Sequence, residues 1–326
     1  MNIRCFTAVV LISGIALSAV ATLSFAAEYP SKPITLIVPY PPGGPADTMA
    51  RLLQQPLTDT LGQQLVIENR PGAAGVIASH EVARAAPDGY TLLFTNVGPS
   101  AVAPVLQPNA GYDPVADFAA VSLVSRSPLL LVVNPSFPAK TLSELITRAK
   151  EKPESINYSS AGPGSFGHLS SVLFAQAAGV KMVHVPYKGQ APALTAVLSG
   201  EVSMALTAPS GAMNEYIKEG RLRLLGVSTL QPSSLAPGAT PIATVVPDFD
   251  PAFWFGVTAP AKTSPAIVSK LNMALKGALA IPALQQKFID TGNIAEASTP
   301  EEFAALIAKE AERWRDVIKK SNITLN

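Results

Sequence analysis

The 326-residue sequence is poor in cysteine, histidine and charge. Its one cysteine, Cys5, precedes the first apolar run, so the rest of the chain can form no disulfide and offers no thiolate to a metal or a substrate. The three histidines, His80, His168 and His184, are far apart and have no ligand-spaced carboxylate beside them, so no metal site is expected. Charged residues make up 14% of the chain and the formal net charge is +1, which argues against nucleic acid and anionic membranes as partners.

The N-terminus has the pattern of a secretory signal. Arg4 supplies a positive start, residues 6–23 form an apolar run, and Ser24-Phe25-Ala26 is a small-x-small cleavage site. An uncleaved anchor is the alternative, because the run approaches membrane-spanning length. The richness of the run in Ala, Ser, Gly and Thr favours cleavage near Ala26, and the exported chain is expected to be soluble.

Alternating strand-like and helix-like segments predict an α/β protein. Compact apolar segments at 34–40, 65–68 and 90–95 each precede a loop rich in glycine or hydroxyl residues and then a helical segment. Such β-loop-α units predict a right-handed, mostly parallel sheet with helices on both faces. The first of these helices is expected to begin at Thr48 and to kink or break at Pro56.

A second series of strands and helices begins near residue 129, which predicts a second domain. Everything after residue 260 is expected to be helical, and the apolar stripe of the last helix is expected to pack on the first domain. The chain would therefore cross between domains twice, near 126–130 and near 247–257. We expect a signal peptide at 1–26, domain I at 27–126 plus 250–326, domain II at 127–249, and a cleft between them.

The segment 159–168 joins a strand to a helix and contains Gly162, Gly164 and Gly167. Glycines and small hydroxyl residues at the N-terminus of a helix leave backbone amides bare, which favours an anion site. The same glycines satisfy a G-x-G-x-x-G spacing, but the next strand, 181–187, carries no acidic residue to hold a ribose. A small carboxylate is therefore favoured over a dinucleotide.

Catalytic groups are scarce. Ser165 and His168 lie on one short turn, with no G-x-S-x-G motif and no evident acid to orient the imidazole. His168 is equally compatible with ligand contact and with capping its helix, whereas the strand position of His184 favours a structural role. Arg70 and Lys188 could each meet a carboxylate, although Arg70 could also brace its own loop. An exported enzyme acting on a carboxylate remains the alternative to a binding protein.

Characteristic segments run through nearly the whole chain in a fixed order: 29–34, 38–47, 68–75, 87–92, 160–165 with His168-Leu169, 185–189 and 255–260. In these segments the sequence resembles the substrate-binding receptors of tripartite tricarboxylate transporters, the Bug or TctC-like family. The resemblance implies a two-domain periplasmic binding protein of the Venus-flytrap, type II-like class. Such a protein closes on a small carboxylate, uses no cofactor and delivers its ligand to a two-component membrane permease. A monomer is the default expectation.

The resemblance also implies that backbone amides, hydroxyls and ordered waters hold the ligand carboxylate. It nominates ten ligand-binding residues: Tyr40, Gly44, Asp47, Asn96, Ser160, Gly162, Gly164, Ser165, His168 and Thr207. Asp47 could meet a ligand ammonium or could only cap its helix. The loop 96–100 departs from the Thr/Ser-rich version usual in the family, so ligand preference stays open among tricarboxylates, dicarboxylates, aromatic acids, nicotinate and amino acids.

Overall fold

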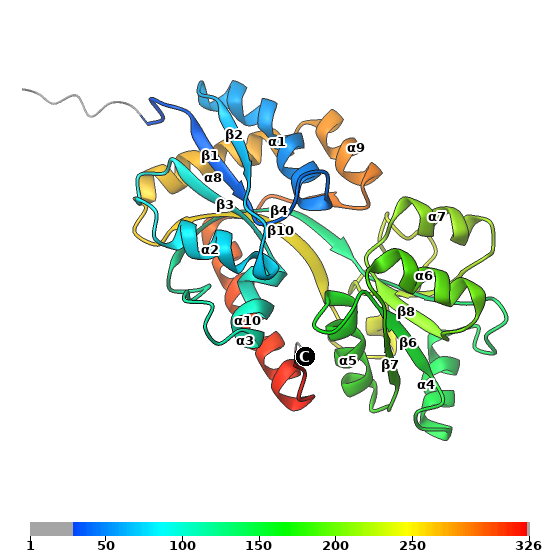
Figure 1. Cartoon of the computed structure of the whole chain (residues 1–326). Coiled ribbons are helices and arrows are strands. Elements are labelled where there is room, and N and C mark those ends of the chain that lie inside the picture. The colour runs from blue at the N-terminus through cyan, green and yellow to red at the C-terminus, as the bar shows by residue number, and fades with distance from the viewer. Residues whose placement is uncertain (1–28, 325–326) are drawn as a thin grey trace, which may run out of the picture.

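The computed structural model describes residues 29–324, so the predicted signal segment lies outside the described residues. Two β-sheets stand side by side (Figure 1). The larger has the strand order β11 (Ile294–Ala295), β4 (Phe118–Pro128), β10 (Ala252–Pro260), β3 (Thr91–Asn96), β1 (Ile34–Val38) and β2 (Leu65–Asn69). The smaller has the order β7 (Val183–Pro186), β6 (Asn157–Ser160), β8 (Met204–Thr207), β5 (Leu130–Val133) and β9 (Arg223–Val227).

Each sheet has its own set of helices (Figure 1). Beside the larger sheet lie α1 (Pro45–Leu61), α2 (Val76–Ala83), α3 (Ala103–Leu106), α8 (Pro265–Leu279), α9 (Pro282–Asp290) and α10 (Pro300–Lys320). Beside the smaller lie α4 (Leu142–Glu151), α5 (Phe166–Ala178), α6 (Gln190–Ser199) and α7 (Gly211–Lys218). Short turns of helix occur at η1 (Ala73–Gly75), η2 (Gly98–Val102) and η3 (Ile242–Thr244). Within residues 29–324, no single helix has both the length and the apolar character to cross a membrane, although α8 and α9 together, with a 77° bend between them, pass on length and composition.

The predicted α/β class with two sheets is confirmed, but the expectation of mostly parallel sheets is wrong. Strand β1 is parallel to β2 and β3, whereas β10 is antiparallel to β3 and β4. In the smaller sheet β6 is parallel to β7 and β8, whereas β5 is antiparallel to β8 and β9. Both sheets are therefore mixed, and in the larger one β4 leads out of the sheet while β10 returns to it, so these neighbouring strands run in opposite directions.

Helix α1 differs from its prediction at both Pro45 and Pro56. It begins at Pro45 rather than at Thr48, because proline suits the first position of a helix. It also continues through Pro56, where a kink or a break was expected. Leu53 and Leu57 on either side of Pro56 are buried, and burying each contributes about 1.5–3 kcal/mol, which offsets the cost of about 3 kcal/mol of an internal proline.

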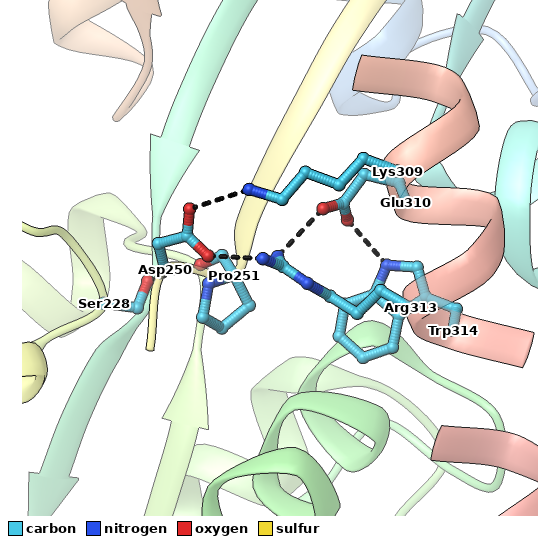
Figure 2. Close-up of polar contacts among 7 residues, drawn as sticks. All are labelled: Ser228, Asp250, Pro251, Lys309, Glu310, Arg313 and Trp314. Carbon is cyan, nitrogen blue, oxygen red and sulfur yellow. Dashed lines mark hydrogen bonds and ion pairs between the residues drawn. The ribbon is translucent and has the colours of Figure 1, made fainter. Parts of the chain in front are cut away.

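The two segments that join the sheets are tied together by one serine. The Ser228 hydroxyl donates to the carbonyl of Pro251 at 2.6 Å and accepts from the amide of Leu129 at 2.8 Å. Beside them, the Asp250 carboxylate forms ion pairs with Arg313 and Lys309 of α10 (Figure 2). The crossings are therefore fastened to each other and to the C-terminal helix.

Candidate ligand-binding site

A cavity of about 300 Å³ lies between the loops of the two sheets. One wall comes from the segments that follow β1 and β3, and the other from the loop between β6 and α5. The residues that line it are Tyr40, Ala74, Asn96, Val97, Gly98, Val102, Ala103, Leu106, Gln107, Pro163, Gly164, Ser165, Phe166 and Phe253.

The larger-sheet wall presents the amide of Asn96 to this cavity. The Tyr40 hydroxyl donates to Asn96 Oδ1 at 3.0 Å, and the amide of Gly98 donates to the same oxygen at 2.8 Å. Burial raises the pKa of Tyr40 to about 12, so its hydroxyl is neutral at physiological pH. These two bonds fix the orientation of the Asn96 side chain, whose NH₂ group makes no hydrogen bond with any residue of 29–324. A ligand oxygen could therefore accept from it.

The glycine loop uses its own amides internally, which corrects the expectation that they are bare. The amide of Gly162 donates to Ser160 Oγ at 3.1 Å, and that of Gly164 donates to His168 Nδ1 at 3.1 Å. Both glycines have positive φ angles, 123° and 71°, that other residues rarely adopt. Ser165 caps α5 by accepting from the amide of His168 at 3.3 Å. Roles for these residues in ligand binding stay a prediction.

Free backbone donors remain at the two residues that follow Ser165. The backbone amides of Phe166 and Gly167 lie in the first turn of α5, and neither has a hydrogen-bond partner among the described residues. They stand at the positive end of the helix dipole, where an anion is favoured. An anion at this loop would meet the start of α5 rather than the amides of the two glycines before it.

His168 and His184 form a stacked pair behind the glycine loop. Their ring centroids are 3.9 Å apart with an interplanar angle of 6°, and Tyr158 stacks on His184 at 5.1 Å. His184 Nε2 lies 2.7 Å from Ser160 Oγ. Desolvation, with His184 nearby, lowers the pKa of His168 to about 4, and desolvation also lowers the pKa of His184. Both imidazoles are therefore neutral at physiological pH and shape the loop without adding positive charge.

Asp47 organises the loop that precedes α1 and does not line the cavity. Its Oδ2 accepts from the amide of Gly43 and from Arg51 Nε, both at 2.9 Å, and its Oδ1 accepts from Asn69 Nδ2 at 3.0 Å. The hydrogen bond from Arg51 is the main cause that lowers the pKa of Asp47 to about 2. Gly44, the residue before α1, also lies outside the cavity lining.

Ser160 and Thr207 line a second, much smaller cavity of about 30 Å³, which Gly167 also lines. There Gln190 Nε2 donates to Thr207 Oγ1 at 3.1 Å. Arg70 lies outside both cavities, paired with Glu68 and Glu81, so it braces its own loop.

Four of the ten nominated residues thus line the larger cavity together: Tyr40, Asn96, Gly164 and Ser165. Sequence reasoning missed its apolar wall, chiefly Leu106, Phe166 and Phe253. The apolar run that begins at Phe253 was visible in the sequence, but nothing marked one of its residues as facing a cavity. Among residues 29–324 no group of three or more His, Cys, Asp or Glu could hold a metal ion.

Comparison with known proteins identifies the family. Residues 49–323 match the model of the tripartite tricarboxylate transporter family receptor. Protein BugT of Bordetella pertussis (strain Tohama I) is 36% identical over 313 residues, covering 95% of this chain and 96% of BugT.

Two solved structures share the fold and a third of the sequence. Rpa4515 of R. palustris with adipate superposes with a TM-score of 0.73 at 34% identity, covering 91% of this chain and 99% of the other. MatC (Rpa3494) of Rhodopseudomonas palustris with bound malate superposes with a TM-score of 0.70 at 33% identity, covering 89% and 100%. The chain belongs to the tripartite tricarboxylate transporter receptor family.

Proposed function

We propose that this protein is a periplasmic receptor that binds a small carboxylate between its two lobes and delivers it to a two-component membrane permease. The observation that carries the proposal is the cavity whose walls come from the loops of two separate sheets. The relatives solved with adipate and malate support a carboxylate as the ligand class. The signal-like residues 1–26 support the location.

Binding would act by shifting a conformational equilibrium. Taking the lobes as 27–126 plus 250–326 and 127–249, the segments tied by Ser228 form the hinge between them. A ligand that touches Asn96 on one wall and Ser165 on the other makes more contacts when the lobes close. It therefore binds the closed state more tightly and increases its population.

The geometry favours a receptor over the alternative, an exported enzyme acting on a carboxylate. A serine nucleophile needs a base within hydrogen-bond reach of its hydroxyl. Here Ser165 Oγ accepts from the backbone amide of His168, while His168 Nδ1 accepts from the amide of Gly164. The hydroxyl of Ser165 and the imidazole of His168 therefore hydrogen-bond to backbone amides of the loop rather than to each other. Recovery of the ligand chemically unchanged after long incubation distinguishes the receptor from the enzyme.

The test is a thermal-shift screen of the purified, ligand-free protein against small carboxylates. A ligand at 100 times its dissociation constant adds about 2.7 kcal/mol to the free energy of unfolding. At about 2–4 °C per kcal/mol, this raises the midpoint of thermal unfolding by several degrees. Asn96→Asp should abolish the shift, because it replaces the donating NH₂ group with a charge that repels a carboxylate. Asn109→Asp makes the same change on an exposed turn and should leave the shift intact. If no carboxylate shifts the midpoint, the proposal is wrong.

A further inference from the structure

We propose that the cavity selects carboxylates that carry an alkyl or aromatic body over short hydroxylated acids and over tricarboxylates. The inference rests on the proposed function and adds the ligand class to it. Two features of the cavity carry it: an apolar wall built from both lobes, and a lining in which none of the described residues is a lysine or an arginine.

The apolar wall is assembled from distant parts of the chain. Leu106 comes from the end of α3, Phe166 from the start of α5 and Phe253 from β10. The rings of Phe166 and Phe253 pack edge to face with centroids 5.4 Å apart, and Trp314 of α10 supports Phe166 at 5.2 Å. Supported rings of this kind form a fixed surface against which an alkyl chain or an aromatic ring can pack.

Among residues 29–324, no lysine or arginine belongs to the cavity lining. Two arginines of the larger-sheet side are already paired: Arg51 in α1 with Asp47, and Arg70 after β2 with Glu68. The amide of Gln107, the remaining long polar side chain in the lining, donates to a carbonyl at 3.2 Å.

Neutral donors can hold one carboxylate at the polar end of the cavity, namely the NH₂ group of Asn96 and the backbone amide of Phe166 at the start of α5. A second or third carboxylate, or a ligand hydroxyl, would lie against the apolar wall. Removing such a group from water without a partner costs free energy, whereas an alkyl or aromatic body gains from burial there. The cavity therefore discriminates by the chemistry of the ligand body.

Isothermal titration calorimetry with a homologous series of straight-chain carboxylates tests this ligand preference. From propionate to octanoate, each added CH₂ group should tighten binding about fourfold until the cavity is full. Benzoate should bind at least about tenfold more tightly than malate or citrate. Tighter binding of malate or citrate, or affinity that does not change with chain length, would overturn the ligand class while leaving the receptor proposal standing. If no carboxylate binds, the receptor proposal itself fails.

The variant Leu106→Lys provides a second, independent test of the ligand preference. Leu106 is only partly buried and ends a helix, so a lysine there can extend into the cavity. The variant should bind octanoate at least about tenfold more weakly and citrate more tightly, because it removes apolar surface and adds a cation. Val115→Lys adds the same charge at a residue that is 51% exposed and outside the cavity, and should change neither affinity. Unchanged selectivity in folded Leu106→Lys would contradict the inference.

Discussion

Protonation of His168 should destabilise the protein below neutral pH. In the folded chain the pKa of His168 is lowered from 6.5 to about 4, first by desolvation and then by His184. As the pH falls through 6.5 the unfolded chain takes up a proton that the folded chain does not. The free energy of unfolding therefore decreases by about 1.4 kcal/mol per pH unit, and the loss reaches about 3 kcal/mol near pH 4, where the folded chain also binds the proton.

His168→Asn isolates this contribution. An asparagine oxygen can take the place of Nδ1 and accept from the amide of Gly164, but it cannot be protonated. Urea unfolding at pH 7.5, 6.5, 5.5 and 4.5 should show that the wild-type protein loses about 2–3 kcal/mol more than the variant over this range. His184 is present in both proteins, so its own titration cancels to first order.

His80→Asn is the matched control, because it removes a histidine from α2 rather than from the stacked pair. Its unfolding free energy should follow the wild-type pH dependence. If wild type and His168→Asn instead lose stability in parallel from pH 7.5 to 4.5, His168 is not buried as a neutral acceptor and the account of the loop is wrong.

Two further predictions concern a buried ion pair and a close packing contact. Arg313→Met should lower the free energy of unfolding in urea by about 3 kcal/mol, because it leaves the buried carboxylate of Glu310 with only the indole of the neighbouring tryptophan; a change below about 1 kcal/mol would contradict this. Gly256→Ala should lower the free energy of unfolding by about 1–3 kcal/mol, because the new Cβ would lie 2.1 Å from Cζ of Phe303. The control Gly277→Ala, whose Cβ meets open space in α8, should raise it by about 0.5–1 kcal/mol. A reversed order of the two melting temperatures would refute the packing argument.

Local patterns predicted the elements, and distant pairings limited the prediction of the sheets. The apolar segments at 34–40, 65–68 and 90–95, for example, correspond to the strands β1, β2 and β3. Strand β10 lies between β3 and β4 although it comes more than a hundred residues later in the chain. Local signals could not predict this pairing, and so could not predict the mixed sheet. Pro56 was misjudged because tertiary burial on both sides of it outweighs its local cost.

The polar part of the site was predictable because it follows strand ends. Tyr40 and Asn96 come after or at the end of strands that meet at one edge of the larger sheet, and Ser165 begins a helix after a glycine loop. The partners of Asp47 and His168 are chosen by side-chain geometry that spacing alone does not reveal. The apolar wall carries no chemical signature in the sequence, since most apolar residues in such a chain belong to its core.

A receptor of this kind binds one carboxylate between its lobes and releases it chemically unchanged. Isothermal titration of the purified protein with octanoate or benzoate at pH 7.5, followed by mass spectrometry of the released ligand, tests it most directly. We expect one site per chain, loss of binding in Asn96→Asp and recovery of the ligand intact. Absence of binding by any carboxylate, undiminished binding in the folded variant, or a chemically altered ligand would contradict it.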